Sequence, residues 1–298
     1  MRHDGERAVQ LRAGARLAEW GSAKVGAAIP ARAKEFLEHQ RMLLIGAADA
    51  SGAVWCSLLT GPPGFADVAD DRTVVVDALP GPADPLAGRF GEEHDVGVLA
   101  IEPSTRRRMR VNGHGLAAGG RLVVHTDQVY SNCPKYIQVR AVLPDDRPRP
   151  AGRESRAQVT DALTAGQRRR IAAADTFFVA TRAEGLGSDA SHRGGNPGFV
   201  TVSGDHRLSW PDYAGNAMYM TLGNLALDPR CGLLFVDWDS GTTLQLTGRA
   251  GTDWDPDRAA AVPGAQRIVD FTVDRVVEIT GASPLRWEFG GYSKFNPA

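Results

Sequence analysis

Residues 97–101 read Gly-Val-Leu-Ala-Ile and residues 232–236 read Gly-Leu-Leu-Phe-Val, so a glycine-led apolar segment occurs twice, 135 positions apart. The tripeptide Pro-Gly-Phe at 63–65 likewise recurs at 197–199, at an offset of 134. In both copies another glycine follows 16 positions after the leading glycine. Matches that stay in register over this length indicate a tandem duplication, with one residue inserted between the two sets of matches.

Each copy has the same succession of predicted elements. A short helix, at 31–40 and again at 164–174, precedes an apolar strand at 42–45 and 176–179. Turn residues then occur every 8 to 15 positions between alternating apolar runs, which is typical of a small antiparallel barrel and not of a βαβ sheet. The sequence therefore predicts a mainly β protein of two tandem barrels, each with five or six short strands and a small helix between the third and fourth. Further strands are expected at 53–59, 73–78, 96–101, 107–112, 121–126 and 135–143, then at 206–210, 217–221, 231–237, 242–248 and 268–280, with small helices near 85–92 and 221–228 and an irregular stretch at 188–195.

A proline-rich segment separates the copies. Residues 144–153 contain three prolines and charges of both signs, a composition that suits neither a helix nor a sheet. We therefore expect an N-terminal arm at 1–30, a first barrel at 31–143, a linker at 144–159, and a second barrel with a C-terminal tail at 160–298.

Composition excludes several classes of protein. The chain has 34 Lys and Arg against 35 Asp and Glu, a balance that argues against a general nucleic-acid binder. No apolar run approaches the roughly 18 residues of a membrane span, and the charged N-terminus lacks a signal-peptide core. Three cysteines without a Cys-x-x-Cys pair favour a reducing compartment. These features together predict a cytoplasmic protein that binds neither nucleic acid nor membrane.

Common catalytic motifs are missing or lack their context. Residues 185–190 have the Gly-x-Gly-x-x-Ala spacing of a dinucleotide-binding loop, but that motif needs a helix directly afterwards. The next residues, 191–198, contain three glycines and a proline, so they cannot form one. No His-x-x-x-His pair, Gly-x-Ser-x-Gly elbow or Walker loop is present, and no metal site is expected.

The segment from Ser191 to Asn196 has a different character. Ser191, His192 and Arg193 are three consecutive hydrogen-bond donors, and two glycines follow that allow a ligand close to the backbone. An arginine fork suits a phosphate. Downstream, Thr221 and Asn224 lie where a strand gives way to a helix, whose free amides suit an anion. Taken alone, the segment is equally consistent with a glycine-rich surface loop that exposes an arginine.

Three longer runs carry a family resemblance. Residues 192–200 (HRGGNPGFV), 219–225 (YMTLGNL) and 228–237 (DPRCGLLFVD) resemble the FMN-binding split-barrel superfamily, and more closely its pyridoxamine 5′-phosphate oxidase-related, tandem-repeat flavin-nucleotide-binding subgroup. Residues 107–113 and 133–138 are similar to further motifs of those proteins. The resemblance implies that two split barrels enclose FMN where they meet. In this chain both barrels would come from one polypeptide, as an intrachain pseudo-dimer.

The sequence also departs from the oxidase pattern. The oxidase strand Arg-x-x-x-Leu-Lys has no lysine here after Arg193, and Lys135 is our candidate to replace it at the phosphate. The C-terminal Arg-x-His pattern of the oxidase is replaced by Leu285-Arg286-Trp287-Glu288. Pyridoxamine phosphate is therefore not the expected substrate.

The resemblance implies a set of candidate site residues. Arg193 and Lys135 would hold the phosphate, Thr221 and Asn224 would reach the phosphate or ribityl oxygens, and Gln245 the pyrimidine edge. His192 is the candidate catalytic residue, as a donor to the flavin or an acid. For Thr221 and Asn224 the alternative is helix capping, for Gln245 it is a solvent-facing side chain on a strand, and for His192 it is a structural hydrogen bond. Cys133 is expected to be inert. The full cofactor-binding set is Ser191, His192, Arg193, Gly194, Gly195, Asn196, Met220, Thr221, Leu222, Asn224, Gln245 and Lys135.

The leading hypothesis is an FMN-dependent oxidoreductase that acts on a small organic substrate or oxygen. Its electrons would come from NAD(P)H, a partner reductase or the substrate itself, because the chain has no convincing NAD(P) domain. Alternatives are a non-catalytic flavin-binding electron carrier, a haem-binding split barrel and a protein that binds the deazaflavin F420. The first copy has Leu58, Leu59 and Pro62 where the second has His192, Arg193 and Asn196. We therefore expect one FMN per chain, in a monomer or a homodimer.

Overall fold

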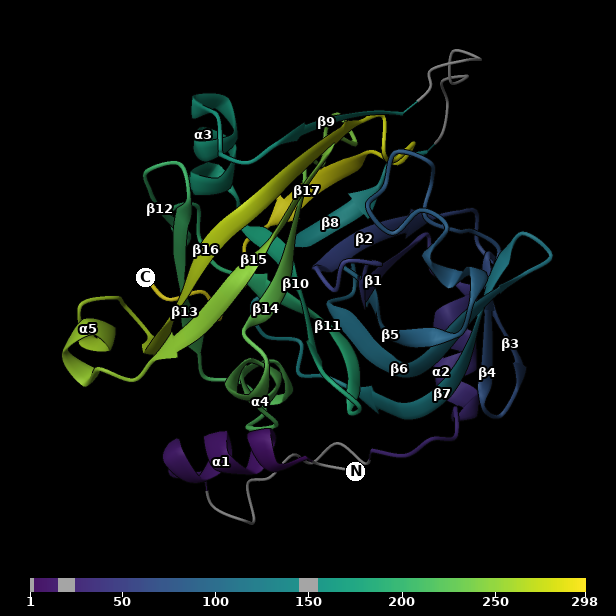
Figure 1. Cartoon of the computed structure of the whole chain (residues 1–298), viewed down its shortest axis with the longest axis horizontal. Helices are drawn as coiled ribbons and strands as arrows, with labels where there is room; N and C mark the ends of the chain where they lie inside the picture. The colour runs from purple at the N-terminus through teal and green to yellow at the C-terminus, as the bar shows by residue number, and fades with distance from the viewer. Residues whose placement is uncertain (1–2, 16–24, 145–154) are drawn as a thin grey trace.

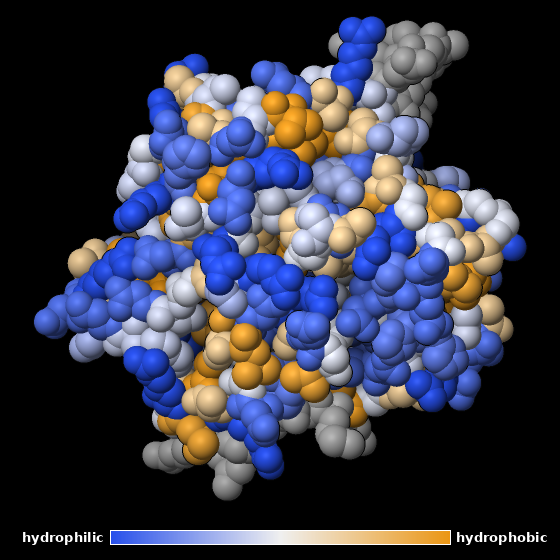
Figure 2. Space-filling view, in the orientation of Figure 1, coloured by the Kyte–Doolittle hydropathy of each residue, from blue (hydrophilic) through white to orange (hydrophobic). Residues whose placement is uncertain are grey.

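A computed structural model describes residues 3–15, 25–144 and 155–298. The protein is mainly β and consists of two tandem split barrels that pack against each other as an intrachain pseudo-dimer (Figure 1). In the part of the chain that is described, no helix is both long and apolar enough to cross a membrane. The face in Figure 2 is largely hydrophilic, with apolar residues most evident in the region of helix α4 (Met220–Leu227).

The first barrel is one seven-stranded antiparallel sheet in the order β2-β1-β5-β6-β7-β4-β3. Helix α2 (Ala31–Glu38) precedes it and buries Phe36 and Leu37 in its core. A single 3₁₀ turn, η2 (Arg89–Gly91), precedes the strand β5. The strands are β1 (Met42–Ala48), β2 (Val54–Thr60), β3 (Ala66–Asp70), β4 (Thr73–Val76), β5 (His94–Glu102), β6 (Arg107–Ala118) and β7 (Arg121–Ser131).

The second barrel repeats the same path, β11-β10-β14-β15-β16-β13-β12. Its helix α3 (Ala165–Ala173) begins with a capping box between Thr164 and Gln167, and α5 (Pro256–Ala260) is a short surface helix. The strands are β10 (Thr176–Ala183), β11 (Gly187–Gly194), β12 (Thr201–Ser203), β13 (Arg207–Tyr213), β14 (Arg230–Val236), β15 (Thr243–Asp253) and β16 (Ala265–Thr280).

Three elements lie outside the repeated sheets. Helix α1 (Asp4–Arg12) packs on α4, at the lower edge of Figure 1. Strand β8 (Val139–Val142) pairs with β17 (Trp287–Gly291), and β9 (Arg156–Thr160) pairs with β16. The expected linker, 144–159, therefore runs into strand β9, and its residues 145–154 lie outside the described part of the chain.

The register confirms the duplication. Gly97 pairs with Gly46 between β5 and β1, and Gly232 pairs with Ala180 between β14 and β10, at the equivalent place. The later glycine of each copy lies at a β-bulge, where a Cβ would collide with the backbone of the neighbouring strand; the two are Gly113 and Gly248. The same backbone irregularity is thus conserved in both copies.

The two barrels meet around a pseudo-twofold axis. Gly97 lies against the backbone of Asp189, and Gly232 lies against the backbone of Trp55, which is the equivalent of Asp189 at the offset of 134. Apolar side chains from both barrels fill the space between them, including Leu99 and Leu234, which are fully buried. Burial of apolar surface therefore holds the halves together.

Four local predictions differ from the structure. Residues 188–195 were expected to be irregular, but 187–194 form β11, because pairing with β10 and burial between the barrels outweigh a low strand propensity. Residues 217–221 do not form a strand, since Ala217 and Tyr219 have positive φ and α4 begins at Met220. Near 85–92 there is a 3₁₀ turn, and of 135–143 only Val139–Val142 is a strand.

Candidate functional site

A pocket lies between the barrels, where β6 and the segment after β7 face β11, β13 and the first turn of α4. Four cationic side chains line it, and aromatic rings form much of the remaining wall. The cations are Arg108, Arg110, Lys135 and Arg193; the aromatic residues are Tyr136, Phe199, Tyr213 and Tyr219. Tyr136 and Tyr213 contact each other, with ring centroids 5.1 Å apart. The pocket therefore combines positive charge with aromatic surface.

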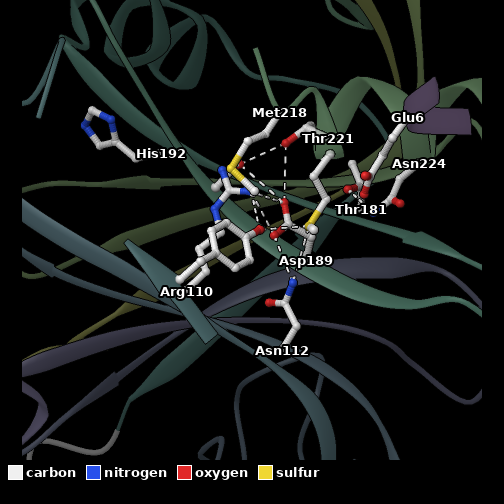
Figure 3. Close-up of polar contacts among 12 residues, drawn as sticks. Glu6, Arg110, Asn112, Thr181, Asp189, His192, Met218, Thr221 and Asn224 are labelled. Carbon is white, nitrogen blue, oxygen red and sulfur yellow. Dashed lines mark hydrogen bonds and ion pairs between the residues drawn. The ribbon is translucent and has the colours of Figure 1, made fainter. Parts of the chain in front are cut away.

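One of these cations, Arg110, is paired across the barrel interface. Its Nη1 donates to both carboxylate oxygens of Asp189 at 3.0 Å and to the Tyr130 hydroxyl at 3.2 Å, and its Nη2 donates to Ser191. The Ser191 hydroxyl lies 2.8 Å from that of Thr221. Figure 3 shows Asp189 at the centre of this cluster. Although burial opposes it, the interaction with Asp189 raises the pKa of Arg110, so this arginine is a fixed structural charge.

The other two arginines make no ion pair within the described residues, although the Asp212 carboxylate, which also lines the pocket and is paired with Arg267 at 3.0 Å, acts on the charge of Arg193. Arg108 donates to Nδ1 of His192 at 2.9 Å, and Arg193 donates to the His192 carbonyl at 3.0 Å. No ion pair of either is found within the described residues, and the Nε atom of each is buried without a hydrogen-bond partner. Burial and the nearby Arg110 and Arg193 lower the pKa of Arg108 to about 9, and burial lowers the pKa of Arg193, although the nearby Asp212 opposes that shift. Two incompletely compensated cations at one pocket favour an anionic ligand.

His192 is buried among these arginines. Burial, followed by the charges of Arg108 and Arg193, holds its pKa well below the ordinary value, so the imidazole is neutral near pH 7. Because Nδ1 accepts from Arg108, the proton is on Nε2, which has no partner within the described residues. His192 can therefore orient Arg108 and donate from Nε2, but it cannot serve as an imidazolium acid at neutral pH.

Strained backbone concentrates at the pocket. Among the described residues, four other than glycine have positive φ: Arg106, Tyr136, Ala217 and Tyr219. All but Arg106 line the pocket. Such conformations cost about 1–3 kcal/mol each and cluster at functional sites. The distribution marks this pocket as a functional candidate independently of its charge.

Helix α4 directs its first turn at the pocket. Tyr219 is its N-cap residue, has no side-chain cap bond, and lines the pocket together with Met220, Thr221 and Leu222. The first amides of a helix have no partners within the helix, and the helix dipole is positive at that end. The helix start therefore adds uncharged donors to the arginines.

The structure brings most of the predicted set together. Seven members line the pocket: Lys135, His192, Arg193, Gly194, Met220, Thr221 and Leu222. Ser191 lies behind it, bonded to Arg110 and Thr221. Gly195 does not line the pocket, and Asn196 is exposed and bonds the Pro297 carbonyl at 2.9 Å. Asn224 bonds Thr181 at 3.0 Å, on the far side of Met220.

Gln245 lies in the opposite half of the pseudo-dimer. Its amide donates to the Cys56 carbonyl and the Ser57 hydroxyl at 3.0 Å, and to Asp84 at 3.1 Å. At the repeat offsets Gln245 is the counterpart of Arg110, and Ser57 is the counterpart of Ser191. The region around Gln245, Ser57 and Asp84 is thus the counterpart of the candidate pocket, and we call it the second half-site. The side chains of these residues bond one another there, and Leu86 occupies the position of Thr221.

Sequence reasoning missed Arg108 and Arg110 as site residues. They are two positions apart on β6 and so share a face, and their counterparts in the second copy are the uncharged Thr243 and Gln245. That difference between the copies is the signal that could have identified them. Cys133 also lines the pocket and is partly exposed, whereas burial raises the pKa of Cys56 and Cys231.

No protein-family model and no curated protein matches the sequence. Among solved structures, a candidate pyridoxamine 5′-phosphate oxidase from Lactobacillus delbrueckii is 17% identical, with a TM-score of 0.33 over 39% of this chain and 94% of its own. A Clostridium acetobutylicum protein of the pyridoxinephosphate oxidase family is 12% identical (TM-score 0.30; 40% and 89%). HupZ of Group A Streptococcus is 10% identical (TM-score 0.31; 44% and 98%). At these scores the assignment of the fold rests on this chain's own sheet topology.

Proposed function

We propose that the pocket between the barrels binds FMN, one per chain, and that the protein is an FMN-dependent oxidoreductase acting on a small organic substrate or oxygen. The observation that carries the proposal is a pair of partly buried arginines, Arg108 and Arg193, that make no ion pair within the described residues and lie beside an uncapped helix start. A phosphate dianion in the pocket would add acceptors for the guanidinium groups that line it. Charge-assisted hydrogen bonds of this kind contribute about 1.5–3 kcal/mol each.

The remaining residues fit the other parts of FMN. Lys135 and the Thr221 hydroxyl add donors for the phosphate or ribityl chain, and Phe199, Tyr136 and Tyr213 offer apolar cover for a ring system. Bound FMN would supply a group that accepts and returns a hydride equivalent. The chain would neutralise the phosphate through Arg108 and Arg193, exclude water with its aromatic wall, and offer the proton on Nε2 of His192 as a hydrogen-bond donor.

One site per chain follows from the difference between the halves. The second half-site has Leu58, Leu59 and Leu86 at the positions of His192, Arg193 and Thr221, and the Gln245–Ser57–Asp84 bonds fill its polar centre. Leucines there would leave a phosphate desolvated without compensation. Because both barrels come from one polypeptide, a monomer suffices for this site.

The proposal is tested by the spectrum and by one variant. Purified protein should show a flavin spectrum, with one flavin released per chain on denaturation. A haem or deazaflavin spectrum would instead support those cofactors, and a bound flavin that NAD(P)H, a reductase and candidate substrates all fail to turn over would support an electron carrier. Arg193→Ala should weaken FMN binding about 10- to 150-fold while riboflavin, which lacks the phosphate, changes far less. Arg169→Ala, on the exposed side of α3, is the matched control.

Equal losses of FMN and riboflavin in Arg193→Ala would place the arginine away from the phosphate. Two flavins per chain would contradict the argument from the closed half-site. No flavin binding by the wild-type protein, reconstituted with excess FMN, would refute the proposed cofactor.

A further inference from the structure

Helix α1 is an addition outside the duplicated sheets. The corresponding stretch of the second copy includes strand β8, so α1 has no helical counterpart there. In the first copy, the place of α4 is taken by the short turn η2. Within the described residues, the packed pair α1–α4 therefore occurs beside the candidate pocket and not beside the second half-site. Val9 of α1 enters the core of the second barrel with Leu222 and Leu225.

Gln10 connects α1 to the strained part of the pocket wall. Its side chain is fully buried, and its Nε2 donates to the carbonyls of Ala217 and Met218, both at 3.2 Å. These carbonyls belong to the segment in which Ala217 and Tyr219 have positive φ. Without Gln10 both carbonyls would lose this buried donor, so the two hydrogen bonds restrain the backbone between Ala217 and Tyr219. Gln10 is thus positioned to hold the approach to α4 in its strained form.

Two other contacts bring α1 against α4 itself. Gly5 and Gly223 lie so close that a Cβ on Gly5 would collide with the Gly223 carbonyl, and one on Gly223 would collide with the backbone of Glu6. His3 caps α1 and bonds the Asn224 side chain at 2.8 Å. These contacts therefore hold α4 closely against α1.

From these contacts we infer that α1 positions the anion-binding wall of the pocket, with Gln10 as its principal positioning residue. Loss of Gln10 leaves the carbonyls of Ala217 and Met218 without their donor and releases the left-handed conformation at Tyr219. The first turn of α4 then no longer directs its amides at the ligand. The identity of the ligand rests on the proposed function, whereas the positioning of the turn does not.

The test uses the full-length protein with Gln10→Leu, which keeps a side chain of similar size, and Arg7→Ala on the exposed face of α1 as the control. In ligand-free protein, hydrogen exchange of the amides of 223–227, the first of which bonds the Tyr219 carbonyl, should accelerate about tenfold or more in Gln10→Leu, while β14–β16 exchange unchanged. FMN affinity should fall about tenfold or more, and riboflavin affinity less. Gly5→Ala should shift both measurements in the same direction.

Exchange within about twofold of wild type in a folded Gln10→Leu variant would overturn the positioning role. Faster exchange with unchanged FMN affinity would overturn the connection to the site. If Gln10→Leu does not fold, Gln10→Met, which likewise lacks the amide donors and has a side chain of similar length, gives the same comparison. Should wild-type protein fail to bind FMN, the proposed function fails, and the exchange measurement still decides the positioning role.

Discussion

Replacing Arg108 with Met should affect stability and ligand binding in opposite directions. Burial, together with the neighbouring Arg110 and Arg193, lowers the pKa of Arg108 from its ordinary value to about 9. At 1.36 kcal/mol per pKa unit, this sets an upper limit of about 5 kcal/mol on the destabilisation of the ligand-free protein. The bond to His192 and the packing of the side chain offset part of it. We expect ligand-free Arg108→Met to be about 1–2 kcal/mol more stable than wild type.

The same substitution should weaken FMN binding by about 1.5–3 kcal/mol, or about 10- to 150-fold, because it removes a charge-assisted bond. Chemical denaturation of ligand-free protein and calorimetric titration with FMN, both at one salt concentration, measure the two effects. The pH dependence adds a check of sign. Because the folded-state pKa of Arg108 is lowered, wild-type stability gains as pH rises above about 9, so the advantage of the variant should shrink there.

A ligand-free Arg108→Met protein that is less stable than wild type by more than about 1 kcal/mol, with unchanged FMN affinity, would refute this reasoning. Arg108 would then be a structural residue that is already compensated. Arg169→Ala, a surface arginine outside the pocket, should change neither quantity.

Two further predictions concern Gln245 and His192. Gln245→Leu should lower the free energy of unfolding by about 1–3 kcal/mol, because Ser57 and Asp84 lose a buried partner, yet leave FMN affinity within about twofold; a large loss of affinity would place Gln245 at the ligand after all. The pKa of His192 is held well below its usual range, so His192 should not titrate near pH 6–7. The pH dependence of turnover in that range should therefore be the same in the wild-type protein and in His192→Gln. A wild-type pH–rate profile with an inflection there that His192→Gln lacks would show that the imidazole titrates during turnover.

The sequence alone was sufficient for the duplication and for part of the pocket. Glycine-led strands at a constant offset reveal a repeat because a bulge or a close backbone approach excludes every side chain, as at Gly113, Gly248, Gly97 and Gly232. Arg193, Thr221 and Lys135 could be selected because donors near glycines or at a helix start form a local pattern, and all three line one pocket. Such local patterns can be recognised from the sequence alone, because the residues that form them are close together along the chain.

Only the tertiary structure decided which face of each strand meets the other barrel. Arg108 and Arg110 belong to the pocket because β6 crosses onto β11, about 80 residues away along the chain, and no local pattern encodes that crossing. Gln245 has the same alternating pattern but lies in the opposite half-site. That Arg108 and Arg193 make no ion pair within the described residues also depends on every neighbour that folding brings near them. Their lowered pKa values, and with them the case for an anionic ligand, therefore arise from burial, which is a property of the whole assembled chain.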